Sequence, residues 1–310
     1  MSTVSVVICA YDEGRWDQLV AAVGSVETQQ QGADEIVVVV DHNPTLLRRA
    51  RKELAGARVV PNRACQGLAG ARNSGIAAAG GDILVFLDDD AVAESQWLGR
   101  LLEPYAERSV AGVGGRIVPA WQRERPRWWP EEFDWVVGCT YRGMPENRAM
   151  VRNLIGCNMS FRREVFERVG AFTEGIGRVG TRPVGCEETE LCIRLTQGWP
   201  GTSIVYEPAA LVHHHVPAHR ASWSYFRRRC FAEGQSKARV TTSVGAVDAL
   251  SSERQYVLRT LGGGVARGIG AAAHGDAAGL GQAASIAAGV ALAAAGYADG
   301  TLARRRGRAA

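Results

Sequence analysis

Three consecutive aspartates, Asp88, Asp89 and Asp90, follow an apolar run of five residues that ends at Leu87. Such a run is typical of a buried strand, so the three carboxylates stand where a strand meets solvent. Carboxylate oxygens are the ligands that Mg²⁺ or Mn²⁺ prefers, and these cations commonly bind together with a phosphate. One aspartate could instead cap a helix expected near Ser95, but capping does not need three. The pattern therefore favours a metal and phosphate site.

Two other apolar runs end on acidic or aromatic residues. Ser5–Ala10 is followed by Tyr11 and then Glu13, and Ile36–Val40 is followed directly by Asp41. The carboxyl ends of the strands in an open parallel sheet line one crevice, so these side chains should meet the aspartate run there. So many carboxylates repel one another unless a positive charge lies among them, which again points to a divalent cation.

The first hundred residues alternate between short apolar runs and helical segments. Each run is apolar throughout instead of at every second residue, which indicates a parallel sheet covered on both faces. No GxGxxG sequence follows the first run and no GxxxxGK[ST] sequence is present, which argues against a dehydrogenase and a P-loop nucleotide hydrolase. The predicted strands are Ser5–Ala10, Ile36–Val40, Arg58–Val60 and Ile83–Leu87, and the predicted helices are Trp16–Thr28, Leu46–Leu54 and Leu68–Ala79.

Composition excludes several classes of protein. The chain has 310 residues, of which 46% are hydrophobic and 22% charged, and its net charge is +4. A disordered or collagen-like protein is excluded, and nothing indicates a nucleic-acid partner. The seven cysteines form no CxxC pair, so we expect reduced thiols and no zinc site, in a cytoplasmic protein without a signal peptide. The apolar stretch Ala283–Tyr297 is expected to be too short to span a membrane.

Acidic residues open a helix expected in the second half of the chain. Glu187 and Glu188 stand in its first turn, where the helix dipole favours negative charge, and Glu190 is spaced to pair with Arg194. Nearby, Asn158 and Arg162 are either acceptor contacts or parts of a plain strand, turn and helix.

Three histidines follow one another in the segment Val212–Pro217. Alternation along a strand should place His213 and His215 on one face and His214 on the other. The histidines are either a polar strand end or metal ligands. They could also trap zinc weakly, although no other soft ligand is placed to complete a zinc site.

Two further segments leave alternatives open. Aromatic residues are dense over Trp121–Tyr141, as a platform for sugar rings or lipid chains or as a second small core. Trp223–Ala238 reads as a basic amphipathic helix, which would lie on a membrane surface or pack its aromatic residues on the sheet. Beyond Ala246 the sequence becomes rich in alanine and glycine and ends in an arginine cluster.

Five segments follow one another in a specific order: Ser5–Glu13, Val40–Asp41, Gly67–Gly75, Gly81–Asp90 and Cys186–Arg194. Together they resemble bacterial family 2 glycosyltransferases of the GT-A fold, over about residues 3–240. The family usually has Pro-Thr before the Tyr-Asn-Glu motif, where this chain has Cys-Ala before Tyr-Asp-Glu. The resemblance implies an α/β fold with a Rossmann-like, mostly parallel sheet and helices on both faces. It also implies a transferase domain over 1–240, with a nucleotide-binding half (1–118) and an acceptor half (119–240), and a helical C-terminal extension over 241–310.

The resemblance also assigns roles to the site residues. Asp90 would ligate Mg²⁺ or Mn²⁺ beside the donor diphosphate, with His214 as a further ligand. Glu188 matches the base that deprotonates the acceptor hydroxyl, and Glu187 is the alternative. The nucleotide would be bound by Tyr11, Glu13, Asp41, Arg72, Asp88 and Asp89.

The implied function is inverting, metal-dependent transfer of a sugar from a nucleoside-diphosphate sugar to a hydroxyl group. The acceptor would be a glycan, a lipid-linked molecule or a small molecule, and peripheral contact with the inner face of a membrane stays open. A sugar nucleotidyltransferase is one alternative, but it normally has a glycine-rich loop with a basic residue directly after the first strand, which residues 11–16 lack. A non-catalytic sugar-binding protein is a second alternative, against which Asp88, Asp90 and Glu188 argue.

Overall fold

A computed structural model describes residues 2–177, 185–245 and 256–307. Contacts divide the chain into two compact units. Unit 1 comprises Met1–Val118, Pro145–Thr181 and Glu187–His214, and unit 2 comprises Pro119–Met144, Arg182–Cys186 and His215–Ala310. The functional division expected at residue 240 stays a prediction.

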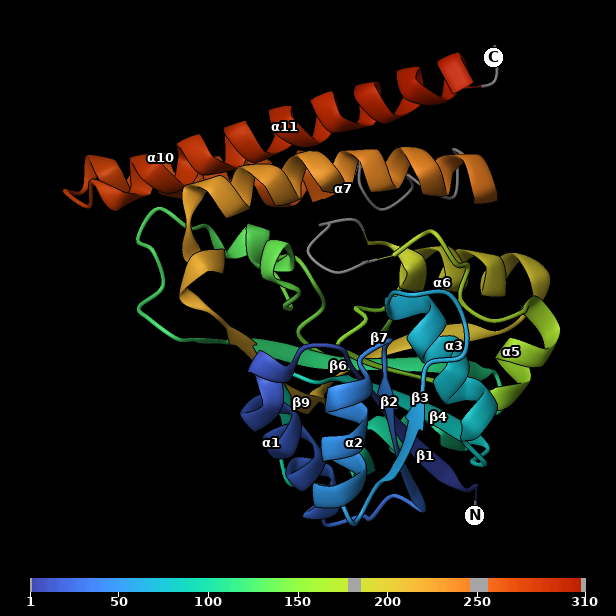
Figure 1. Cartoon of the computed structure of the whole chain (residues 1–310). Helices are drawn as coiled ribbons and strands as arrows, with labels where there is room; N and C mark the ends of the chain where they lie inside the picture. Colours follow the sequence, from blue (N-terminus) through green and yellow to red (C-terminus); the bar gives the residue numbers. More distant parts are fainter. Residues whose placement is uncertain (1, 178–184, 246–255, 308–310) are drawn as a thin grey trace. The chain divides into compact units, whose positions relative to one another are not determined.

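The first half of unit 1 alternates strands and helices, as Figure 1 shows. β1 pairs with β2 on one side and β4 on the other, β3 adds to β2, and all three pairings are parallel. The four predicted strands and three predicted helices are therefore confirmed, with shifts only at their ends. The elements are β1 (Val4–Ala10), α1 (Trp16–Glu27), β2 (Glu35–Val40), α2 (Pro44–Glu53), β3 (Arg58–Pro61), α3 (Leu68–Ala78) and β4 (Ile83–Asp88).

The second half of unit 1 continues the same sheet with antiparallel strands. The order is β3-β2-β1-β4-β8-β6-β9-β5, with β7 on β9, and β8 runs antiparallel to both β4 and β6. The α/β fold is confirmed, and the described pairings of the strands added after β4 are antiparallel, namely β8 with β4 and β6, and β5 and β7 with β9. The further elements are β5 (Ala91–Ala93), α4 (Trp97–Leu102), β6 (Val110–Trp121), β7 (Ala149–Met150), β8 (Asn158–Arg162), α5 (Arg163–Val169), α6 (Glu187–Gly198) and β9 (Ser203–Val216).

Both faces of the parallel strands are buried, which explains why the runs are apolar throughout. Val7 and Phe86 pack in one cluster with residues of α3, α5 and α6. Val6 and Val38 point to the opposite face and are also fully buried. Gly75 lets α3 approach β1 closely, because a Cβ atom at this position would come within 2.4 Å of a Val7 methyl group.

Asn158 is part of the interior of unit 1. It is 0% exposed; its Oδ1 accepts from Trp97 Nε1 at 2.8 Å, and its Nδ2 donates to the carbonyl groups of Ala210 and Arg116. Arg162 donates to backbone carbonyl groups, including that of Val110. The structure thus favours the strand-and-turn interpretation of both residues over acceptor contacts.

We predict that Asn158→Ala lowers the free energy of unfolding by about 1–3 kcal/mol, because it leaves a buried indole N–H and two carbonyl groups without their partner. Urea denaturation measures this change. Asn153→Ala is the control, since Asn153 in the preceding loop is only partly buried and bonds its near neighbours. Equal stability of the two variants would contradict the prediction.

Unit 2 has an aromatic core. Trp129, Phe133 and Phe226 are buried, and Trp128 and Trp223 pack on Phe226. The small-core interpretation of the aromatic segment is therefore confirmed. In the described residues of unit 2 the helical segments are η3 (Glu131–Val137) and η4 (Ala218–Ala221), both 3₁₀, then α7 (Trp223–Val244), the π-helical η5 (Tyr256–Leu261), α10 (Gly262–Ala273) and α11 (Ala278–Gly307).

The C-terminal helix α11 is longer than the apolar stretch expected from the sequence. Over Ala278–Ala303 it is long and apolar enough to cross a membrane by length and composition. Of the apolar 18-residue window in this range, 28% is buried. α11 also packs along α7 (Figure 1). The expectation that this stretch is too short to span was therefore wrong, and length does not distinguish a packed helix from a spanning one.

Candidate active site

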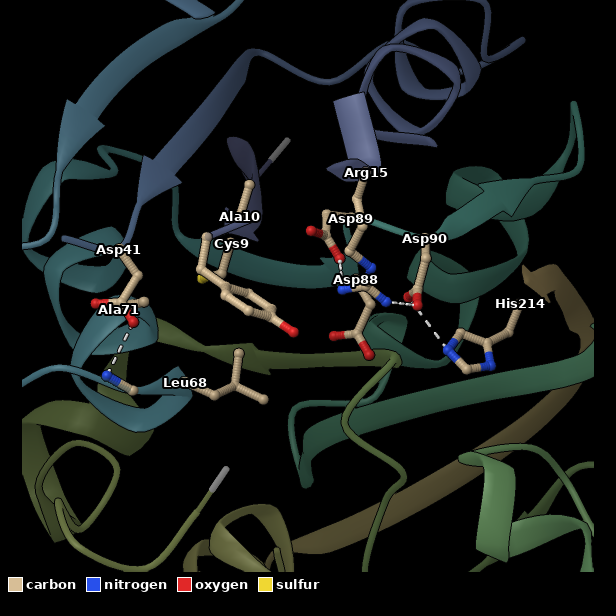
Figure 2. Close-up of a pocket in the computed structure, with 12 residues that line it drawn as sticks. Cys9, Ala10, Arg15, Asp41, Leu68, Ala71, Asp88, Asp89, Asp90 and His214 are labelled. Carbon is tan, nitrogen blue, oxygen red and sulfur yellow. Dashed lines mark hydrogen bonds and ion pairs between the residues drawn. The ribbon is translucent and has the colours of Figure 1, made fainter. Parts of the chain in front are cut away.

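A pocket opens at the carboxyl ends of β1, β2 and β4, where the sequence places the site. Tyr11 follows β1, Asp41 follows β2 and Asp88 ends β4. Figure 2 shows Asp41, the three aspartates of the run and His214 around the pocket. All belong to unit 1. The residues lining the pocket are Cys9, Ala10, Tyr11, Arg15, Asp41, Gly67, Leu68, Ala71, Asp88, Asp89, Asp90 and His214.

Asp41 is fixed at one end of the pocket. Its Oδ1 accepts from Asn62 Nδ2 at 2.6 Å and lies 2.8 Å from His42 Nδ1, while its Oδ2 accepts from the Gly67 amide at 2.9 Å. Gly67 has a φ of +126°, which favours glycine and explains its place in the Gly67–Gly75 motif. A carboxylate offers about four acceptor positions, so this group can still accept a hydrogen bond from a ligand.

The aspartate run carries its own positive partner. Arg15 donates from Nη1 to Asp89 Oδ1 at 2.7 Å and pairs through Nη2 with Asp90. Asp89 and Asp90 are buried, and the side chain of Asp88 is 30% exposed. Buried carboxylates need such a partner, because an unpaired charge is costly to bury.

Arg72 does not line the pocket and is only 2% exposed. Its guanidinium group donates to Glu187 Oε1 at 2.9 Å and to the Gly156 carbonyl group at 3.1 Å, and lies 3.6 Å from Asp88 Oδ1. Burial alone would lower the pKa of Arg72, but the nearby Glu187, Asp88 and Glu188 raise it above its usual value. Arg72 thus connects α3, α6 and the end of β4.

The two glutamates at the start of α6 differ in their surroundings. Glu187 is 3% exposed and paired with Arg72, and its Oε2 has no hydrogen-bond partner among the described residues. Glu188 is only partly buried. The expected pair between Glu190 and Arg194 forms at 2.9 Å.

The histidines alternate along β9 as expected. His214 is buried and its Nε2 lies 3.2 Å from Asp90 Oδ1, whereas His213 is partly exposed and pairs with Glu94. Ligand atoms of Asp88, His214 and Cys157 all lie within 4.8 Å of one another. Together with Asp90, Asp88 and His214 offer two carboxylates and one imidazole, which fit a divalent cation such as Mn²⁺.

Residues 5–170 match the family model described as "Glycosyl transferase family 2". The chain belongs to this family. It is 35% identical over 238 residues to the glucosyl-dolichyl phosphate glucuronosyltransferase of Haloferax volcanii, an alignment that covers 76% of each chain. It is 30% identical to the succinoglycan biosynthesis protein ExoM of Rhizobium meliloti, over 55% of this chain and 52% of that protein.

Solved structures share the GT-A fold of this transferase. The mannosyltransferase PcManGT of Pyrobaculum calidifontis, solved with GDP-Man and Mn²⁺, superposes with a TM-score of 0.63 at 20% identity, over 94% of this chain and 86% of that one. GalNAc-T7, solved with UDP, GalNAc and Mn²⁺, gives a TM-score of 0.56 at 20% identity, over 83% and 54%. Family membership makes the chain a glycosyltransferase and not a nucleotidyltransferase.

The fold brings most of the predicted site residues of this glycosyltransferase together, but not all. Tyr11, Asp41, His214 and the aspartate run line the pocket, whereas Arg72, the partly buried Glu188 and the exposed Glu13 do not. Sequence reasoning missed Arg15, although it lies in the short segment that directly follows the first strand. It also missed Cys157, which carries no motif of its own.

We predict that Arg15→Gln lowers the stability of the metal-free protein and strengthens Mn²⁺ binding, because a cation can then replace the lost positive charge beside Asp89 and Asp90. The loss should be about 1–3 kcal/mol, as for removing a charged hydrogen-bond donor. Thermal melting with and without Mn²⁺ measures both effects. Arg100→Gln, which breaks only an exposed pair with Glu103, is the control. An Mn²⁺-induced shift no larger than in the unmodified protein would contradict the prediction.

Proposed function

We propose that this transferase moves a sugar from a nucleoside-diphosphate sugar to an acceptor hydroxyl group, with a divalent cation and inversion at the anomeric carbon. The observation that carries the proposal is the meeting of Asp88, Asp90 and His214 at the strand ends beside Asp41. Carboxylates and an imidazole suit a cation that binds phosphate, and Asp41 offers an acceptor for a base. Mn²⁺ in two structural neighbours supports the choice of cation.

Each pocket residue then has a defined part. Asp90 and His214 would hold Mg²⁺ or Mn²⁺, which would neutralise charge on the leaving diphosphate. Asp41 would accept a hydrogen bond from the base, and Tyr11, Glu13 and Asp89 would belong to the nucleotide site. Asp88, whose ligand oxygen lies within 4.8 Å of the ligand nitrogen of His214, would ligate the cation on the side of the ribose. Arg72 is buried and does not line the pocket. We therefore propose that it holds Asp88 and Glu187 in place and does not contact the nucleotide.

Glu188 is the proposed general base. It stands in the first turn of α6, where the helix dipole favours its ionised form. Glu187 is committed to the buried Arg72 and would lose this pair on accepting a proton. Glu188 is therefore better placed to take the proton of an acceptor hydroxyl group.

We predict that Glu188→Gln lowers the transfer rate by about 10²–10⁴-fold, the usual share of a general base, while nucleotide-sugar binding stays unchanged. Glu187→Gln should instead lower stability, because it leaves the buried Arg72 charge without its ion-pair partner. Transfer assays, donor titration and urea denaturation of both variants separate the two effects. Loss of transfer in Glu187→Gln with wild-type stability, and full transfer in Glu188→Gln, would refute the assignment. Absence of metal-dependent transfer in the unmodified enzyme, with any nucleoside-diphosphate sugar, would instead favour a sugar-binding protein.

The acceptor is proposed to be a glycan, a lipid-linked molecule or a small molecule. The Haloferax volcanii relative is named for a dolichyl phosphate substrate, which supports a lipid-linked acceptor.

We also propose a peripheral contact between unit 2 and the inner face of a membrane. Arg227 and Arg228 of α7 are exposed, and neither forms an ion pair with another described residue. They line a groove together with Phe231 and with Leu292 of α11. α11 carries no charged residue from Ala278 to Ala298. Exposed arginines beside an uncharged apolar helix suit an anionic lipid surface.

We predict that the double variant Arg227→Gln and Arg228→Gln binds anionic lipid vesicles about thirtyfold more weakly, since each basic residue near such a surface contributes about 1 kcal/mol. Vesicle sedimentation at two salt concentrations measures the binding. Arg48→Gln with Arg49→Gln, another exposed adjacent pair, is the matched control. Equal binding of both double variants would refute the contact.

A further inference from the structure

Cys157 does not line the pocket, but the pairing of two strands brings it beside Asp88, which does. β4 and β8 are antiparallel, with Leu87 opposite Asn158. The next step of this register sets Cys157 opposite Asp88, and side chains directly opposite each other in an antiparallel pair point to the same face. Cys157 therefore stands beside the first aspartate of the run, although the two are far apart in the sequence.

A third strand adds His214 to the same place. His214 of β9 pairs with Ala91 of β5, directly after the aspartate run. The ligand atoms of Asp88, Cys157 and His214 lie within 4.8 Å of one another. Ligand atoms around a four-coordinate zinc ion lie roughly 3.5 Å apart, so modest side-chain movement would close this set around one cation.

The burial of the three residues suits an ion that enters from the pocket. Cys157 and His214 are 3% and 4% exposed, whereas the side chain of Asp88 is 30% exposed. Arg72 holds the turn that carries Cys157 in place, because it donates a hydrogen bond to the Gly156 carbonyl group. A cation approaching along Asp88 would therefore meet a positioned sulfur and an imidazole.

We infer that Cys157 supplies a thiolate ligand to the divalent cation held by Asp88 and His214, and that the site consequently prefers borderline and soft cations such as Zn²⁺, Co²⁺ and Cd²⁺ over Mg²⁺. The inference rests on the proposed metal-dependent function and adds a ligand to it. As the sulfur–metal bond forms, the S–H bond breaks and its proton passes to solvent. The structure thereby supplies the soft ligand that the sequence did not reveal beside the histidines.

Thiolate ligands select softer metals because sulfur is polarisable, whereas Mg²⁺ binds almost only oxygen. Cys9 is a natural comparison, because it lines the pocket but does not belong to the cluster of Asp88, Cys157 and His214. Burial raises the pKa of its thiol to about 12. Cys9 thus has the same thiol group as Cys157 without its neighbours.

The test titrates the full chain with Co²⁺ and records absorption in the near ultraviolet, where a thiolate bound to Co²⁺ gives a charge-transfer band. We expect the band in the unmodified protein and in Cys9→Ser, and its loss in Cys157→Ser. Mutating a residue that only supports a metal ligand typically lowers metal affinity by roughly 10–100-fold. Cys157→Ser removes a ligand itself, so its Cd²⁺ affinity should fall by at least that factor. Mg²⁺ affinity should not change.

The outcomes separate this inference from the proposed function. If dialysis shows bound Co²⁺ in the unmodified protein but no charge-transfer band appears, Cys157 is not a ligand, and the proposed transferase with oxygen and histidine ligands stands. This measurement uses only the unmodified protein, so a folding defect in Cys157→Ser cannot affect its result. A band that survives in both Cys157→Ser and Cys157→Ala also overturns the inference. If neither Co²⁺ nor Mn²⁺ binds with or without a nucleoside diphosphate, the proposed metal dependence fails together with it.

Discussion

The buried guanidinium group of Arg72 is the constraint on which the site of unit 1 depends. An arginine keeps its charge inside a protein, so burying it requires carboxylate partners and satisfied donors. Glu187 and the Gly156 carbonyl group accept its hydrogen bonds, and Asp88 lies 3.6 Å away. One side chain of α3 thereby sets the start of α6, the turn before β8 and the end of β4. These are the segments that carry Glu188, Cys157 and the aspartate run.

Charge balance at the strand ends changes the argument for a metal ion. In the sequence, the clustered carboxylates predict a cation, because no positively charged side chain is assigned a place among them. The structure supplies two guanidinium groups, with Arg15 on Asp89 and Asp90 and Arg72 beside Asp88. Repulsion alone is therefore not a sufficient reason for a metal. The stronger reason is local chemistry, since the ligand atoms of the partly exposed Asp88, a buried imidazole and a thiol lie within 4.8 Å of one another.

What could be predicted from the sequence follows the range of the interactions. The strands and helices up to Asp88 were predictable, because burial on both faces makes each strand apolar and each crossover helical. The antiparallel strands β8 and β9 were not, since their pairing depends on contacts with distant residues. Asp41 and His214 could be predicted from local patterns, namely a motif and the alternation of side chains along a strand. Cys157 could not be predicted in this way. Its place depends on the register between β4 and β8, which no local pattern records.

Arg72 shows a subtler limit of sequence reasoning. Arg72 lies in the Gly67–Gly75 motif, whose two glycines have clear reasons to be there: Gly67 adopts a positive φ and Gly75 lies against Val7. A motif marks importance without direction, however, and in a helix a shift of one residue turns a side chain by about 100°. Arg72 points to the interior and not to the pocket, so its conservative substitution by lysine would keep a charge but lose the forked geometry that reaches Glu187 and Gly156 together. The importance of such a residue therefore lies in holding other residues in place, and only its contacts with Glu187 and Gly156, far away in the sequence, reveal it.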